Sequence, residues 1–182
     1  MLWGQNNLGR LKTTTASGDT DGDGDHDIIY SYGTRSFSIR DLDLELVYDS
    51  GNQLTKNILA DLADRPDADA AMSVLKERSD DKGVEPEAIA IGKLGKKTYA
   101  FVGLERIGGI AVYEISKPAA PTFVTYVNTR NFAANEESPE AGDIGPECVL
   151  FIPAADSPNG EPLVVVAHEV SGTITVFAVK GS

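Results

Sequence analysis

The sequence predicts an all-β fold made of β-propeller blades, and an internal repeat is the main reason. Residues 84–115 and 144–179 share one order of parts: Pro-Glu, an apolar run, a Gly-containing turn, and a second apolar run ending at a glutamate. In each copy a Gly turn then leads to a last apolar strand, IAVYEI in the first and ITVFAV in the second. Strand-built repeats of this length indicate propeller blades.

We expect one domain over residues 1–182 that holds three to four blades as a partial array. The blade-like units span about 8–50, 84–128 and 144–180, and a helical connector covers 53–77. A partial array leaves open strand edges at both ends. These edges predict pairing with the remaining blades, with another chain, or with a second copy.

The first unit, residues 8–50, is the most diverged. The segments IIYSY and SFSIR alternate with period two and are rich in β-branched and aromatic residues. This pattern is typical of strands, which we expect to be joined by a turn at Gly33-Thr34.

In the connector, the spacing of apolar residues changes from the alternation of strands to the spacing of a helix. Leucine and isoleucine recur three and four residues apart between Leu54 and Leu62, which is the spacing of one helical face. Pro66 ends this helix, because proline lacks the backbone N–H that a helix interior needs. A second short helix is then expected in AAMSVLKE.

The charge balance excludes one class of partner. The chain has a net charge of -12, whereas nucleic-acid binding requires a surplus of Lys and Arg. Such acidity suits divalent cations instead. No apolar run approaches the roughly 20 residues of a membrane span.

The chain has a single cysteine. Cys148 lies in the apolar run CVLFI, and we expect a buried, inert thiol there. The abrupt start at Met1 and the end at Ser182 suggest a piece of a longer protein.

An acidic loop is the sharpest local motif. Carboxylates alternate with Gly and other residues in DTDGDGDHD, from Asp19 to Asp27. Calcium takes six to eight oxygen ligands, and alternating carboxylates allow a short loop to surround one ion. The predicted Ca²⁺ ligands are the side chains of Asp19, Asp21, Asp23 and Asp27 and the backbone carbonyl of Asp25. The loop is similar to the calcium loops between strands of integrin-type propeller blades, and a purely acidic turn is the alternative.

The repeat also predicts a cluster of glutamates. Rotation about a propeller axis would bring Glu87 and Glu147 to a common place, and likewise Glu105 and Glu169. Carboxylates held close together raise one another's pKa or recruit a cation, so a second divalent metal or a catalytic site is one interpretation. The other is that these acids only hold strand ends.

Arginines accompany these acids along the sequence. Arg106 follows Glu105, and Arg35, Arg78 and Arg130 occupy starts or turns of the blade units. Their guanidinium groups could bind a phosphate-containing ligand, or could neutralise the glutamates.

Four segments together resemble the bacterial choice-of-anchor I family: GDTDGDGDHDIIYSYGTRSFSI, RSDDKGVEPEAIAIG, TYAFVGLERIGGIAVYEI and GEPLVVVAHEVSGTITVF. The resemblance implies the C-terminal part of an exported propeller of the seven-bladed type, in an extracellular, periplasmic or cell-surface location. It also implies a possible likeness to atypical alkaline phosphatases, with Glu87, Glu105, Arg106, Glu147 and Glu169 at the matching positions.

Two functions follow from these observations. The first is a calcium-binding propeller module with a binding or scaffolding role. The second is a metal-dependent phosphoesterase with acids and arginines around the propeller axis.

Overall fold

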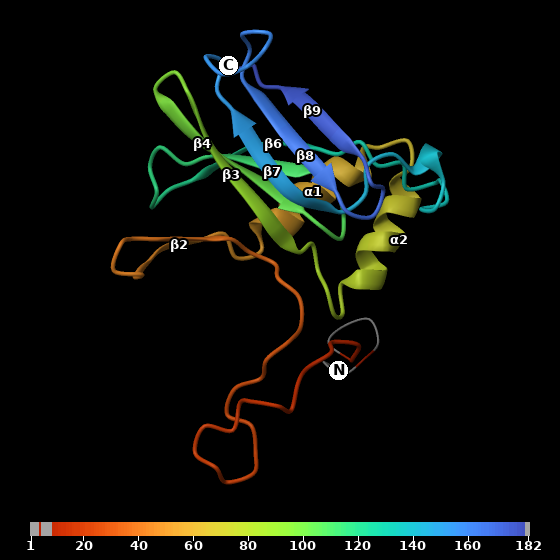
Figure 1. Ribbon diagram of the computed structural model, residues 1–182. Coiled ribbons are helices and arrows are strands. Elements are labelled where there is room, and N and C mark those ends of the chain that lie inside the picture. Colours follow the sequence, from red (N-terminus) through yellow and green to blue (C-terminus); the bar gives the residue numbers. More distant parts are fainter. Residues whose placement is uncertain (1–3, 5–8, 181–182) are drawn as a thin grey trace.

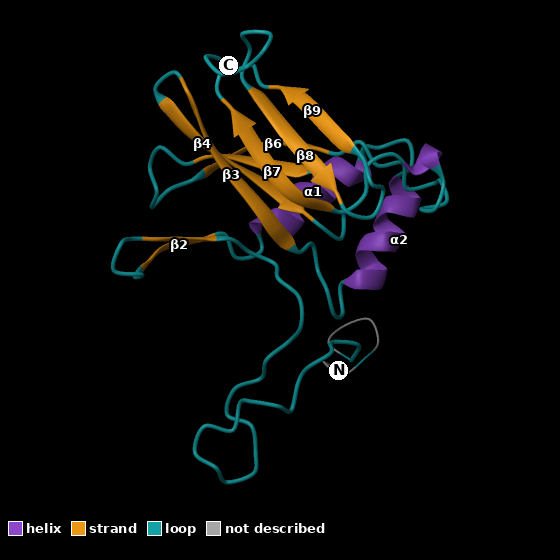
Figure 2. Ribbon diagram, in the orientation of Figure 1, coloured by secondary structure: helices purple, strands orange, loops and turns teal. Residues whose placement is uncertain are grey.

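The structure is a computed structural model that describes residue 4 and residues 9–180. The expectation of a longer protein was based on Met1 and Ser182, and both residues lie outside the described residues. Strands dominate, with two helices and one 3-10 turn (Figure 2). The predicted all-β class is confirmed in this general sense. Each sheet of the described chain is open, and none closes on itself.

The elements form three sheets in chain order. A small hairpin pairs β1 (Ser38–Arg40) with β2 (Leu46–Asp49), and α1 (Gln53–Ala63) and α2 (Ala68–Arg78) follow it. The first large sheet has the order β3 (Pro86–Leu94), β4 (Lys97–Leu104), β5 (Ile110–Glu114) and β6 (Thr122–Val127). After η1 (Pro139–Ala141), the second large sheet has the order β7 (Pro146–Ile152), β8 (Leu163–His168) and β9 (Ile174–Ala178).

The two large sheets repeat one another in backbone detail. The antiparallel register slips at the same place in both, between Pro86 and Ala88 in β3 and between Pro146 and Cys148 in β7. The turn hydrogen bonds also match, since Gly108 N–H donates to the Leu104 carbonyl and Gly172 N–H to the His168 carbonyl. The sequence repeat is therefore a structural repeat, although the later copy has three strands.

The second large sheet packs face to face on the first (Figure 1). Phe101 of β4 stacks on Phe151 of β7 with ring centroids 5.6 Å apart. Gly92 of β3 lies beneath the same ring, where an added Cβ would come within 2.5 Å of it. The absence of a side chain at Gly92 therefore allows this close approach.

The helices cover the opposite face of the first large sheet. Leu54, Ile58 and Leu62 of α1 are fully buried, as their spacing predicted. They pack in one core with Val102 and Tyr113 of the sheet. The burial of this apolar stripe fixes the helices, because short helices gain most of their stability from tertiary packing. Neither helix is long and apolar enough to cross a membrane, within the part of the chain that the structure describes.

The prediction for the first unit was wrong in part. Ile28–Tyr32 forms no strand, and the hairpin turn lies between β1 and β2, where Asp41 N–H donates to the Glu45 carbonyl. The segment projects from the body (Figure 1), and its pairing is limited to a bridge between Thr13 and Ser31. A strand needs a neighbour for its backbone groups, and β-propensity alone does not provide one.

Cys148 is exposed, so the expectation of a buried thiol was wrong. It lies on the outer face of the second large sheet, which no described layer covers. Leu150, Ile174 and Val176 on that face are each more than half exposed. The apolar run reflects a face that is suited to packing yet has no partner among the described residues.

Candidate functional site

The matching bulges bring the predicted glutamates together. Glu87 and Glu147 are the extra residues of the two bulges, and β3 lies against β7, so the two side chains share one end of the sheet pair. Their charges, with that of Glu85, act on Glu105. Glu169 contacts Glu147. The structure thus gathers Glu87, Glu105, Glu147 and Glu169 in one cluster, whereas the repeat predicted two pairs, Glu87 with Glu147 and Glu105 with Glu169.

Glu85 is a member of this cluster that the sequence analysis missed. Carboxylate oxygens of Glu85, Glu87 and Glu105 all lie within 4.8 Å of one another. Glu85 is 3% exposed and has φ 45°, a left-handed conformation that is unusual outside glycine. Gly145 holds the corresponding position in the second copy with φ 75°. The signal that could have found Glu85 is its position directly before Pro86, where the second copy has Gly145 before Pro146.

Arg106 lies between two buried carboxylates. Its Nε is 2.9 Å from Glu85 and 2.7 Å from Glu105, the second being an ion pair without hydrogen-bond geometry. Burial raises the pKa of Glu105, and the charges of Glu85, Glu87 and Glu147 raise it further, while Arg106 opposes the shift. A cation in addition to Arg106 would relieve this excess of negative charge.

The outer pair of acids behaves differently. Glu147 and Glu169 are exposed. A hydrogen bond with Glu169 raises the pKa of Glu147, and the charges of Glu169 and Glu87 add to the rise. A proton shared between two carboxyl groups produces this effect. The cluster therefore combines a buried ion-pair region with an exposed acid pair.

Two of the other predicted arginines, Arg130 and Arg35, have partners outside the glutamate cluster. Arg130 is 4% exposed, pairs with Glu136, and lies over the Phe132 ring at 4.7 Å. Arg35 donates to the Ser79 carbonyl. Arg106 forms ion pairs with acids of the cluster, whereas the contacts of Arg130 and Arg35 involve none of these acids.

His168 ends β8 beside the cluster and is buried. Burial lowers its pKa, and the charge of Asp143 partly opposes this. Asp143 itself accepts hydrogen bonds from the hydroxyls of Thr129, Thr173 and Thr175. His168 is thus neutral at pH 7 and packs at a strand end.

The acidic loop forms a separate candidate site. Oxygens of Asp19, Asp21 and Asp27 lie within 4.8 Å of one another, and all three residues are exposed. Asp23 stands outside this trio and accepts the Asp25 N–H. The loop is closed at its base, where Ile28 N–H donates to the Gly18 carbonyl at 3.1 Å.

Hydrogen bonds within the loop orient its carboxylates. Asp19 accepts the N–H groups of Gly22 and Gly24 through its two oxygens. Asp27 accepts both the N–H and the hydroxyl of Thr20, which lowers the pKa of Asp27. The backbone of the loop thus holds the carboxylates of Asp19 and Asp27 in place, and carboxylate oxygens gathered in this way suit a hard cation.

Comparison with known protein families identifies the family of this chain. The model of the choice-of-anchor I domain matches residues 2–118. The chain belongs to the choice-of-anchor I family. The match covers the acidic loop, the helices and most of the first large sheet, including Glu85, Glu87 and Glu105. Membership of this family indicates an exported protein.

A curated relative extends the similarity to the second sheet. Gigasin-3a of Magallana gigas is 32% identical over 187 residues, which cover 96% of this chain. The chain spans 65% of the length of that relative. No solved structure matches the chain.

Proposed function

We propose that this chain is a calcium-binding module of an exported, extracellular or cell-surface choice-of-anchor I protein, with a binding or scaffolding role. One observation carries the proposal: three carboxylates of a glycine-containing loop lie within 4.8 Å of one another. Three carboxylates at this separation repel one another unless a cation lies between them. Family membership supports the exported setting, where calcium is abundant.

The same proposal includes a propeller arrangement. Two antiparallel sheets with matching bulges stack face to face, and their first strands lie side by side. This is the relation between successive propeller blades. The hairpin of β1 and β2 would be the remnant of a further blade.

Calcium would be held by Asp19, Asp21 and Asp27 through side chains, with Asp23 completing the set and Asp25 offering its carbonyl. Gly22 and Gly24 have φ 80° and 95°, which lets the backbone turn tightly around an ion. The loop lies far from the two cores, so its effect would be local order. An ordered loop fixes a surface for a partner.

Calorimetric titration with Ca²⁺ tests the site. We expect binding by the unmodified protein and a loss of at least about tenfold in affinity for the Asp21→Asn/Asp27→Asn variant, because two ligand charges are removed. Asp25→Asn is the matched control, since its proposed ligand is the backbone carbonyl. Equal affinity in all three proteins would contradict the proposal.

Limited proteolysis gives a second measurement. Calcium should slow cleavage within residues 18–28 because a bound ion orders the loop. The fragment pattern elsewhere should stay unchanged. Cleavage at the same rate with Ca²⁺ and with EDTA would count against a structural calcium site.

A second candidate function is a metal-dependent phosphoesterase at the glutamate cluster. Its support is the triad of Glu85, Glu87 and Glu105, which is close enough to hold one divalent metal. Against it stands Arg106, whose charge two buried carboxylates already neutralise, which leaves less for a phosphate. We therefore rank the binding module first.

An aryl phosphate assay separates the two functions. Hydrolysis with Ca²⁺, Mg²⁺ or Mn²⁺ that Glu87→Gln abolishes would favour the phosphoesterase. Absence of turnover with every metal would favour the binding module. Glu161→Gln, on an exposed loop between β7 and β8, serves as the control.

A further inference from the structure

The glutamate cluster carries more negative charge than the cations beside it can balance. Arg106 pairs with both Glu85 and Glu105, and Lys82 lies 3.6 Å from Glu85. These two cations face the carboxylates of Glu85, Glu87, Glu105, Glu147 and Glu169. A surplus of negative charge therefore remains at this end of the sheet pair, as far as the described residues show.

One oxygen of the cluster is buried and lacks a hydrogen bond. Glu105 is 6% exposed, and no described group donates a hydrogen bond to its Oε2. Arg106 Nε lies 2.7 Å from this atom, but outside hydrogen-bond geometry. A buried polar atom without a hydrogen-bond partner is one of the marks of a bound water or ion. The unsatisfied oxygen thus points to a ligand in the cluster, independently of the number of acids there.

The distances within the cluster fit one cation. Oxygens of Glu85, Glu87 and Glu105 lie within 4.8 Å of one another. Two oxygens that bind one calcium ion, each at about 2.3–2.6 Å, lie at most about 5 Å apart. All three carboxylates can therefore reach the same ion. Glu87 is exposed, which leaves a side open for the entry of the ion and for water ligands.

The second copy of the repeat lacks this arrangement. Gly145 stands in place of Glu85, and Val170 in place of Arg106. That copy keeps two exposed acids but has no buried carboxylate. The first copy is therefore the one suited to hold an ion, and Glu147 adds negative charge from the neighbouring sheet.

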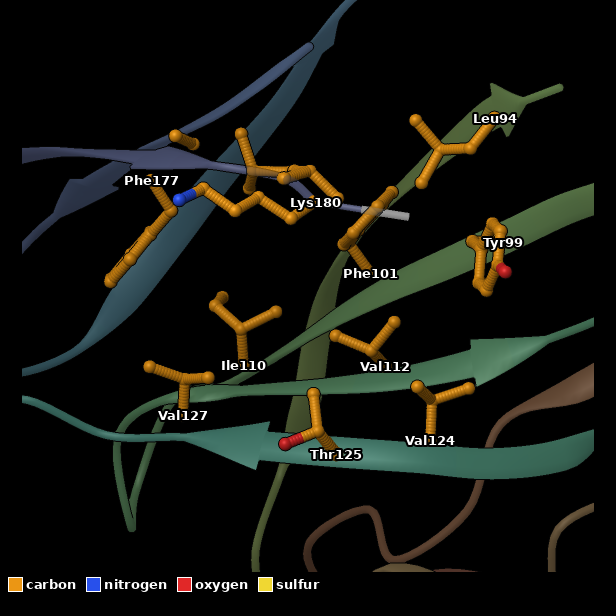
Figure 3. A pocket seen from close by; sticks show the side chains of 13 residues that line it. Leu94, Tyr99, Phe101, Ile110, Val112, Val124, Thr125, Val127, Phe177 and Lys180 are labelled. Carbon is orange, nitrogen blue, oxygen red and sulfur yellow. The ribbon is translucent and has the colours of Figure 1, made fainter. Parts of the chain in front are cut away.

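The rest of the contact between the two large sheets is apolar. Phe101 and Val166 lie in its core. A cavity of about 260 Å³ between the sheets is lined by Ile110, Val112 and Phe177 among others, and by no acid (Figure 3). Charges at the end of such a contact are weakly screened, because few polar groups lie near them. The acids of the cluster are thus concentrated at one end of an apolar contact.

We propose that the glutamate cluster is a second cation site, in which Glu85, Glu87 and Glu105 bind one divalent cation and Glu147 of the second sheet adds its charge. Carboxylate oxygens select hard cations such as Ca²⁺, Mg²⁺ or Mn²⁺. Because β3 lies against β7 at this place, the ion stabilises the contact between the sheets. The site shares its acids with the phosphoesterase candidate but requires no hydrolysis, and it is separate from the acidic loop.

Thermal unfolding at pH 7 tests the site in the Asp21→Asn/Asp27→Asn protein, which lacks two proposed ligands of the acidic loop. About 5 mM of the best of Ca²⁺, Mg²⁺ and Mn²⁺ should raise the melting temperature above its value in EDTA by roughly 2–8 °C, as expected for a Kd of about 0.1–1 mM. No rise with any of the three ions would overturn the proposal. This outcome is independent of calcium binding by the acidic loop, which the unmodified protein reports.

Glu87→Gln in the same background tests the ligands, because it removes one of them and leaves both ion pairs of Arg106 in place. It should lower the affinity for the cation at least about tenfold, measured by calorimetric titration, and remove most of the rise in melting temperature. Glu105→Gln, a second variant, should also respond less to the cation, whatever its melting temperature in EDTA. Glu161→Gln is the matched control, since it changes an exposed glutamate outside the cluster, and should keep the full response. Equal responses of Glu87→Gln and Glu161→Gln would overturn the proposal.

Discussion

Glu85 shows at the residue scale where the two copies of the repeat differ in chemistry. Glycine adopts φ 75° at position 145 without cost, whereas Glu85 adopts φ 45° at the matching position. A non-glycine residue in this region costs about 1–3 kcal/mol and persists where its surroundings hold it. Burial and the ion pair with Arg106 provide that restraint. The ion pair and burial of the Glu85 side chain therefore outweigh the strain in its backbone.

The buried charge of Glu105 predicts a pH dependence. An acid with a raised pKa in the folded state stabilises the fold below its ordinary pKa of 4.5 and loses that contribution as pH rises through the raised pKa. Glu105→Gln resembles the protonated form at every pH. We expect its melting temperature at pH 7 to exceed that of the unmodified protein by roughly 2–4 °C, and the difference to shrink toward pH 4.

Scanning calorimetry in EDTA from pH 4 to pH 7 measures this difference. Glu161→Gln, an exposed glutamate, should show no such trend. A lower melting temperature for Glu105→Gln at pH 7 would mean that the ion pair with Arg106 outweighs the cost of burial.

At the scale of elements, α1 is held by a stripe of apolar side chains. Ile58 is fully buried against the first large sheet. Ile58→Ala should lower the free energy of unfolding by about 2–5 kcal/mol, because it removes apolar contacts and leaves a cavity. Denaturant unfolding measures the loss.

Met72→Ala on α2 is the comparison, since Met72 is 37% exposed. It should change the free energy of unfolding by less than about 1 kcal/mol. Similar losses for both variants would show that α1 is not anchored through its buried face.

The strands show what local pattern can and cannot predict. Alternation located β3 to β5 and β7 to β9 because each has a neighbour supplied by the same repeat. It was wrong for Ile28–Tyr32, where the same kind of alternation lacks a strand beside it. Ile29, for instance, is 72% exposed. Backbone pairing, not propensity, decided the outcome.

At the scale of the whole molecule, contact between the two large sheets depends on Gly92. An added Cβ would come within 2.5 Å of the Phe151 ring. Gly92→Ala should therefore destabilise the protein by about 1–3 kcal/mol through overpacking. Adding Phe151→Leu should recover part of that loss, because the smaller side chain leaves room for the methyl group.

A double-mutant cycle by denaturant unfolding measures this coupling. We expect an interaction free energy of at least about 0.5 kcal/mol between the two sites. Additive effects would show that the sheets do not meet through Gly92 and Phe151.

The sequence by itself determined the repeat, the strand-rich class, the helical connector and the family, since these depend on order and spacing along the chain. It also located Glu87 and Glu147 at matching positions. Tertiary structure alone decided that Glu85 joins them, that Arg106 pairs with the buried acids, and that Cys148 is exposed. These features arise from contacts between segments that are distant in the sequence. The sequence pattern of one segment does not specify which other segments it will contact.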